Sequence, residues 1–176
     1  TVLECCMLCT TAAHTPEQNP IGDPTETALL IAAEKAGFSR ERCKQRYPLH
    51  HMEPFDSETK KMEVTVSYNG TERQYLKGAA DRVLPLCTQL LHGTTVTTLT
   101  ESFREEVRSA VQTLSERALR VLAFAYRESD GDWIFLGLSG MLDPPRESAK
   151  QAIRTCEQAK IQTVMITGDH KKTALA

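Results

Sequence analysis

KMEVTVSYNGTERQYLKG, residues 61–78, carries the clearest structural pattern in this sequence. Apolar and polar residues alternate in its first half, as expected for a strand with one buried face. The apolar positions are Met62, Val64, Val66 and Tyr68. Asn69-Gly70 then supplies the dipeptide that favours a tight hairpin turn, and a second strand returns to Leu76. This stretch therefore predicts a β-hairpin, the start of an antiparallel sheet.

Helices are predicted on either side of this hairpin. GDPTETALLIAAEKAG predicts a helix over 24–36, with Asp23 as N-cap, Pro24 at the first position, Glu26 in a capping box and Gly37 at the end. The opening TVLECCMLCTTA indicates a helix already under way, with no N-cap before it. ADRVLPLC predicts a short helix, and TESFREEVRSAVQTLSERAL an amphipathic one. The apolar face of this amphipathic helix comprises Phe103, Val107, Val111 and Leu114.

Two buried strands are expected next, RVLAFAYRE at 120–128 and DWIFLGLSGML at 132–142, joined by a turn over 129–132. A double proline at 144–145 forbids both helix and sheet pairing and marks a boundary. After it we expect a helix, a strand at 164–166, a glycine loop and the start of another helix. Residues 1–142 are thus predicted to be an α+β domain with an antiparallel sheet flanked by helices. Residues 143–176 are predicted to be an α/β fragment of a second domain.

Composition excludes several classes of protein. Apolar residues make up 40% and charged residues 25% of the 176 residues, which is typical of a soluble globular protein. A net charge of −2 without a basic stripe argues against nucleic-acid binding. The longest apolar stretch, 133–142, is too short to span a membrane, and no signal peptide is recognisable. The sequence also contains no Walker phosphate loop, GxSxG elbow or HExxH motif.

Six scattered cysteines favour reduced thiols in a cytoplasmic setting over a secreted disulfide scaffold. Cys6 and Cys9 have CxxC spacing, so a zinc or redox site has to be weighed. A tetrahedral zinc site needs two further ligands at suitable spacing, and no second pair follows. We therefore expect no metal site.

Several residues admit both a structural and a ligand-binding role. Phe55, beside Lys60 and Lys61, is either a strand-edge aromatic or a platform on which a nucleotide base stacks. Lys77-Gly78-Ala79 either turns the chain between a strand and a helix or lets a ligand approach the backbone near a cationic side chain. Arg120 either reaches phosphate oxygens or extends to the surface. Glu26 either accepts a hydrogen bond from an adenine amino group or caps its own helix.

The order of these pieces is far more informative than any one of them. The chain resembles, over essentially its whole length, the cytoplasmic headpiece of P-type cation-transporting ATPases, and in particular the bacterial members of the calcium-pump-like branch. The motifs that carry the resemblance are CMLCTTA, GDPTETAL, PFDSETKKM, LKGAADRVL, ALRVLAFAYR, GMLDPPR and MITGDHKKTA.

The resemblance implies a nucleotide-binding domain at 1–142, truncated at its N-terminus, and a hinge with part of the phosphorylation domain at 143–176. It implies that Phe55 stacks on adenine and that Glu26 contacts the adenine side. Other residues take implied roles by matching family motifs. Lys60 and Lys77 line the pocket, Gly78 and Ala79 form its floor, Arg120 reaches the phosphates, Asp143 and Arg146 mark the hinge, and Thr167, Gly168 and Asp169 contact the phosphoryl group on the catalytic face.

Two departures from the family pattern are present. Ala80-Asp81 follows the Lys-Gly-Ala motif where the family usually has Pro-Glu, and TGDH stands where animal pumps have TGDN. The phosphorylated aspartate of DKTGT and the magnesium-binding GDGxND loop are not in the sequence. We therefore expect an excerpt of a pump, cut at both ends, that binds ATP without turnover. The expected Kd is roughly 0.1 to several mM, about −4 to −5.5 kcal/mol.

The resemblance further implies ATP and Mg²⁺ as cofactors, the magnesium ligands lying outside this chain. The partners would be the phosphorylation, actuator and transmembrane domains of the same pump, so the chain would be a monomeric cytoplasmic piece of an integral membrane protein. One alternative is a haloacid-dehalogenase-like phosphatase using Asp130 and Asp132, although these residues fall in an expected hairpin turn. The other is a non-catalytic interaction module that does not bind nucleotide.

Overall fold

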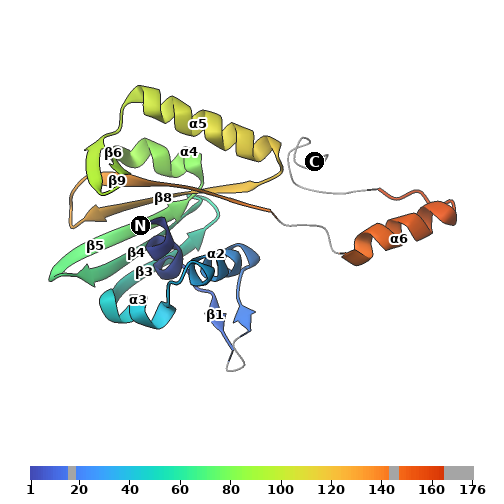
Figure 1. Ribbon diagram of the computed structural model, residues 1–176, viewed down its shortest axis with the longest axis horizontal. Helices are drawn as coiled ribbons and strands as arrows, with labels where there is room; N and C mark the ends of the chain where they lie inside the picture. The colour runs from blue at the N-terminus through green and yellow to red at the C-terminus, as the bar shows by residue number, and fades with distance from the viewer. Residues whose placement is uncertain (16–18, 143–146, 165–176) are drawn as a thin grey trace.

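A seven-stranded sheet in the order β3-β4-β5-β8-β9-β6-β7 forms the centre of the protein (Figure 1). The computed structural model describes residues 1–15, 19–142 and 147–164. The sheet strands are β3 (Leu49–Asp56), β4 (Lys61–Tyr68), β5 (Thr71–Gly78), β6 (Cys87–His92), β7 (Thr95–Thr98), β8 (Arg120–Glu128) and β9 (Trp133–Met141). β1 (Ala13–His14) and β2 (Pro20–Ile21) form a separate two-stranded ribbon. Neighbouring strands are antiparallel except β6 and β9, which run parallel, so the predicted α+β class is confirmed with a mixed sheet.

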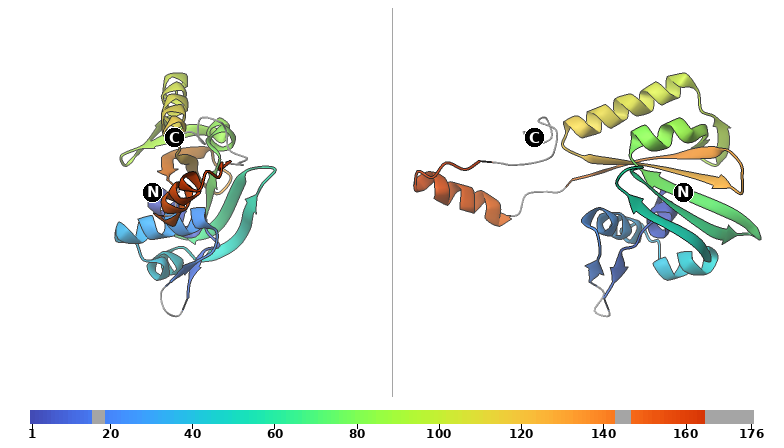
Figure 2. Two further views of the ribbon diagram at one scale, coloured as in Figure 1. Left: turned by 90° about the vertical axis from the view of Figure 1, so that its right-hand side faces the viewer. Right: turned by 180° about the vertical axis from the view of Figure 1, so that it is seen from behind.

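Helices cover both faces of this sheet (Figures 1 and 2). The helices are α1 (Val2–Leu8), α2 (Pro24–Lys35), α3 (Arg40–Arg46), α4 (Ala80–Val83), a 3₁₀ turn η1 (Leu84–Leu86), α5 (Glu101–Glu116) and α6 (Glu147–Gln158). The first three lie on one face and α4 and α5 on the other, while α6 lies to one side of this layered body. None of the helices in the described ranges is long and apolar enough to cross a membrane.

The predicted hairpin forms as expected. Asn69 and Gly70 both have positive φ, 51° and 83°, as the turn that matches the twist of two antiparallel strands requires. Across the turn Tyr68 pairs with Thr71, and the ladder continues to the pairing of Lys61 with Gly78. Met62, Val64 and Val66 are buried, which confirms the alternation seen in the sequence.

The helix boundaries follow from capping. Asp23 Oδ1 accepts hydrogen bonds from the amides of Thr25 at 2.9 Å and Glu26 at 3.3 Å, with Pro24 at the first helical position. This confirms the predicted start of α2. The expectation of an uncapped first helix was wrong, because Thr1 Oγ1 accepts a hydrogen bond from the Glu4 amide and caps α1.

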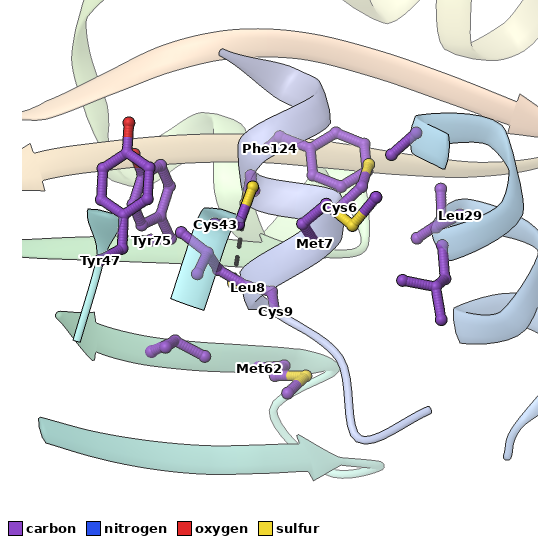
Figure 3. Close-up of a cluster of buried hydrophobic side chains, with 14 of the residues drawn as sticks. Cys6, Met7, Leu8, Cys9, Leu29, Cys43, Tyr47, Met62, Tyr75 and Phe124 are labelled. Atoms are coloured by element: carbon purple, nitrogen blue, oxygen red, sulfur yellow. Dashed lines mark hydrogen bonds between the residues drawn. The ribbon is translucent and has the colours of Figure 1, made fainter. Parts of the chain in front are cut away.

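Two hydrophobic cores lie on opposite faces of the sheet. In the first, α1 is sandwiched between the sheet and α2, with Leu29 and Met62 on either side of it (Figure 3). Cys5 and Cys9 of α1 are fully buried there, and Cys5 Sγ donates to Cys9 Sγ at 3.6 Å. In the second core α5 packs through Val107, which confirms its predicted apolar face. The first core packs α2 against α1 and so brings Glu26 to the end of β5, where the candidate site lies.

Five strands and one helix were not predicted. The strands are β1, β2, β3, β6 and β7, and the helix is α3. β3 is an edge strand that is exposed at seven of its eight positions, so it shows no apolar alternation. β7 is exposed throughout. The strand predicted at 164–166 extends beyond the described residues, and residues 161–164 form no regular element.

Candidate functional site

A buried ion pair joins α2 to the end of β5. Lys77 Nζ lies 2.8 Å from Glu26 Oε1, and the two residues are only 3% and 6% exposed. The other carboxylate oxygen, Oε2, accepts hydrogen bonds from the amide and the hydroxyl of Thr11, both at 2.7 Å. Thr10 Oγ1 and the Ala12 amide approach the same oxygen at 3.3 Å. A buried charged pair with this many hydrogen bonds is a fixed polar centre in an otherwise apolar core.

The environment of Glu26 keeps its carboxyl ionised. Burial alone would raise the pKa of Glu26, but the hydrogen bond from Lys77, the hydrogen bonds from Thr11 and the positive charge of Lys77 outweigh it. The pKa of Glu26 is therefore lowered from its ordinary value. The opposite charges of Glu26 and Lys77 cancel. Lys77 therefore acts mainly as a hydrogen-bond donor to Glu26 and adds little net positive potential.

Three residues of the GDPTE motif, Gly22, Thr25 and Glu26, make contacts that shape the site. A Cβ on Gly22 would lie 2.8 Å from Ala12 Cα, so only glycine lets the start of α2 pack on the loop that follows α1. Thr25 Oγ1 accepts a hydrogen bond from Arg120 Nη1 at 2.7 Å. Glu26 meets Lys77, as described above. The carboxylate of Glu26 thus faces inward, so its predicted part in a capping box was wrong.

Phe55 stands at the sheet edge in the same row as this pair. Glu53 pairs with Glu63 and Asp56 with Lys61, so the two residues between them, Pro54 and Phe55, lie together opposite Met62 in a bulge.

Met62 in turn pairs with Lys77, and Lys77 with Phe124. Phe55 lies on the edge strand β3 and is 55% exposed, so its ring is open to solvent. Phe55 is thus a strand-edge aromatic whose ring a ligand could reach.

Lys60 and the Gly78-Ala79 step meet through the backbone. The Lys60 carbonyl accepts a hydrogen bond from the Ala79 amide at 3.0 Å, and a Cβ on Gly78 would lie 2.5 Å from the same oxygen. Lys60 itself has φ 55° and an exposed side chain. The glycine thus has a steric reason to be there, and Lys60 projects from a turn beside the row containing Met62 and Lys77.

Lys61, the neighbouring candidate, is on the other face of the sheet. Successive strand residues alternate between faces, so Lys61 and Met62 point to opposite sides. Lys61 Nζ pairs with Glu63 Oε1 at 3.0 Å beside a hollow of about 160 Å³. Three carboxylates line this hollow, those of Glu53, Asp56 and Glu63, and they would repel a triphosphate. Of the two lysines, Lys60 is the better candidate for a phosphate contact.

The structure brings together some of the predicted site residues and leaves others undescribed. Glu26 and Lys77 are in contact, Arg120 is joined to the residue before Glu26, and Lys60 abuts Gly78 and Ala79. Phe55 lies apart on the edge strand β3. Five further predicted site residues lie outside the described residues: Asp143, Arg146, Thr167, Gly168 and Asp169.

Three contributors to the site were missed. Thr10 and Thr11 hold Glu26 from fifteen or sixteen residues away, and no sequence pattern links them to it. Asp56 bonds the amides of Glu58 and Thr59 and so shapes the turn that leads to Lys60. An aspartate followed by Ser-Glu-Thr is a recognisable turn signal and would have identified it.

The comparison with protein families decides the class. The family described as "P-type ATPase, cytoplasmic domain N" matches residues 1–148. The chain belongs to this family. This match, together with calcium-transporting ATPases that align with most of the chain, confirms the resemblance drawn from the motifs.

Three bacterial calcium- or cation-transporting ATPases illustrate the similarity. Calcium-transporting ATPase 1 of Bacillus cereus is 38% identical over 185 residues, covering 99% of this chain and 21% of that protein. Calcium-transporting ATPase of Bacillus subtilis is 39% identical over 167 residues, covering 88% and 19%. Cation-transporting ATPase pma1 of Synechocystis sp. is 39% identical over 171 residues, covering 89% and 18%. The chain thus spans about a fifth of the length of the curated relatives it matches.

Proposed function

We propose that this P-type ATPase domain binds ATP and presents it to a phosphorylatable aspartate elsewhere in its pump. The adenine would stack on Phe55, with Glu26 and Lys77 beside the base and Lys60 and Arg120 toward the phosphates. The observation that carries the proposal is the row Phe55–Met62–Lys77 across three strands. This row sets an exposed aromatic ring near a buried, fully bonded Glu26–Lys77 pair. Base stacking on an aromatic ring contributes about 1–3 kcal/mol per base, enough to place a base there.

The cation is inferred from the relatives. Two of the three relatives described above are named calcium-transporting ATPases, so we infer that the pump moves calcium, with this domain on its cytoplasmic side. The remaining domains of the same pump would be its partners. In the intact protein, hinge motion near Asp143 and Arg146 would bring the nucleotide to the aspartate.

Magnesium would accompany the nucleotide rather than sit in this domain. Within residues 1–15, 19–142 and 147–164, no group of three or more His, Cys, Asp or Glu side chains is arranged so that it could hold a metal ion. Mg²⁺ prefers carboxylates, water and phosphate oxygens, so its ligands would come from ATP and from protein groups beyond these residues. It would neutralise phosphate charge during transfer. The role of Lys60 and Arg120 would be to orient the phosphate chain, and that of Phe55 to hold the base.

A phosphatase built on Asp130 and Asp132 fits the structure poorly. Both residues lie in the exposed turn between β8 and β9, which are antiparallel neighbours. A nucleophilic aspartate would need a convergent site around it, with a base and charge-stabilising groups. This arrangement favours the nucleotide-binding proposal.

An NMR titration with ATP, with and without Mg²⁺, tests the proposal. We expect saturable shifts at Phe55, Lys77 and Arg120, with a Kd of roughly 0.1 to several mM. Phe55→Ala should weaken binding about fivefold to a hundredfold by removing the stacking surface. Leu49→Ala is the matched control, since Leu49 lies on the same strand, is 56% exposed and stands at the opposite end from Phe55. Absence of saturable shifts at about 10 mM ATP, or equal losses in the two variants, would refute the proposal.

A further inference from the structure

The loop after α1 grips one oxygen of the Glu26 carboxylate. Thr11 donates both its amide and its hydroxyl to Oε2 at 2.7 Å, the shortest of the hydrogen bonds made to that oxygen. The other oxygen, Oε1, is left to Lys77 Nζ at 2.8 Å. The two oxygens therefore have separate tasks, one anchoring the carboxylate to the loop and one holding the ammonium.

Packing holds this loop against the start of α2. The Gly22 backbone touches Ala12 so closely that a Cβ on Gly22 would lie 2.8 Å from Ala12 Cα. Thr10 and Ala12 are themselves buried, at 2% and 0% exposure. Thr11 itself is exposed between them, so it acts on Glu26 through its two hydrogen bonds and not through packing.

The position of Lys77 depends on this anchor. Lysine carries its charge on a flexible four-carbon stem and moves its ammonium toward water when no partner holds it. The only acidic residue paired with Lys77 among the described residues is Glu26. If the carboxylate turned about its own axis, Lys77 would lose its fixed geometry on the face of the sheet that it shares with Met62.

We propose that Thr11 is a positioning residue for nucleotide binding, acting through Glu26 on Lys77. The inference rests on the proposed ATP-binding function and adds to it a residue that need not touch the nucleotide. Thr11 fixes the carboxylate and the carboxylate fixes the ammonium, so Lys77, which is only 3% exposed, keeps the end of β5 in one geometry before the ligand arrives. Preorganisation of this kind raises affinity by lowering the ordering cost on binding.

Three variants isolate the hydroxyl of Thr11. Thr11→Val removes it while keeping the side-chain shape and the amide, and Thr11→Ser restores it. Thr113→Val is the matched control, because the Thr113 hydroxyl donates to the Ser109 carbonyl on the exposed face of α5. Each protein is titrated with ATP by NMR, and the ¹H–¹⁵N signal of the Lys77 ammonium is recorded without nucleotide.

Thr11→Val is expected to bind ATP about threefold to tenfold more weakly and to shift or broaden the Lys77 ammonium signal. Thr11→Ser and Thr113→Val are expected to match the wild type in both measurements. A loss of stability alone would not move the ammonium signal of the folded protein.

The outcomes separate the two proposals. No saturable binding by the wild type overturns the ATP-binding function and this inference with it. Wild-type binding with an equally strong Thr11→Val, or a Thr11→Ser that does not rescue, overturns only the positioning role. If Thr11→Val does not fold, the test is made on the wild type. The NMR shift of the Thr11 amide proton is then expected to change with pH as the Glu26 carboxyl titrates. An amide that does not respond also overturns the positioning role.

Discussion

The backbone carbonyl of Lys60 accepts a hydrogen bond from the Ala79 amide at 3.0 Å, which joins the start of β4 to the residue after β5. Between these strands Gly78 faces the same carbonyl at a distance that leaves no room for a side chain. The Lys-Gly-Ala motif therefore has a structural reason for its glycine. Two lysines proposed to serve the nucleotide, Lys60 and Lys77, are held at this junction.

Gly78→Ala should destabilise the domain. Its Cβ would meet the Lys60 carbonyl at 2.5 Å, and a backbone atom cannot swing aside as a side chain can. We expect a loss of about 1–3 kcal/mol in the free energy of unfolding by urea, with weaker ATP binding. Gly140→Ala is the control, because its Cβ would make only ordinary contacts, the shortest at 3.4 Å to Leu119 Cδ1. Equal losses in both variants would show that the contact with Lys60 is not responsible.

Lys60→Gly should separate binding from folding. Lys60 has φ 55°, a conformation that costs a non-glycine residue about 1 kcal/mol and costs glycine almost nothing. Glycine also raises the conformational entropy of the unfolded chain, which lowers the free energy of unfolding by a similar amount. Stability should thus stay within about 1 kcal/mol of the wild type. Loss of the charge should weaken ATP binding about threefold to tenfold at low salt, and less at high salt. Lys61→Met, on the other face, should leave ATP affinity unchanged, and a comparable loss there would contradict the assignment of Lys60.

Breaking the Glu26–Lys77 pair from either side should cost about 3–5 kcal/mol of stability, because each single change leaves a buried charge without its partner. Glu26→Gln and Lys77→Met are the two single variants. The double variant should lose less than the sum of the two, which a double-mutant cycle by urea denaturation would measure. Additive losses would indicate that the two residues are not coupled.

Acid should remove the stabilisation supplied by Glu26. Its pKa is lowered in the folded protein, so the unfolded chain takes up the proton at a higher pH than the folded one. The contribution is therefore complete above the ordinary glutamate value and is lost as the pH falls through the lowered folded pKa. The stability difference between wild type and Glu26→Gln should shrink on acidification, as urea curves at near-neutral and acidic pH would show. A constant difference would mean that Glu26 does not titrate as described.

Native thiols should react unequally with Ellman's reagent. Burial raises the pKa of Cys6 and of Cys87 to about 12 and raises that of Cys5 as well, while Cys156 is partly exposed. At pH 8 a thiol of pKa 12 is ionised to only about one part in ten thousand. We expect one fast thiol in the native protein, abolished by Cys156→Ser, and the rest only on unfolding. Fast reaction of Cys6 or Cys9 would revive a redox role for the CxxC spacing.

Part of the site was predictable from local signals. The Lys-Gly-Ala and GDPTE motifs marked Lys77 and Glu26 as candidates because each follows or opens a regular element. Their mutual contact was not predictable, since they are 51 residues apart and meet only when α2 packs on α1 and brings Glu26 to the end of β5. Thr11 was invisible for the same reason, and its side chain matters only through a partner that tertiary packing supplies.

The sequence by itself determined the β4–β5 hairpin, the cap of α2 and the apolar face of α5. Each depends on interactions between residues close along the chain, such as the Asn69-Gly70 turn or the Asp23 cap. Only the tertiary structure decided the edge strand β3, the parallel pairing of β6 with β9 and the partners of Glu26. An edge strand with an exposed face has little hydrophobic pattern to show, and a buried charge finds its partner across a core whose geometry no single segment specifies.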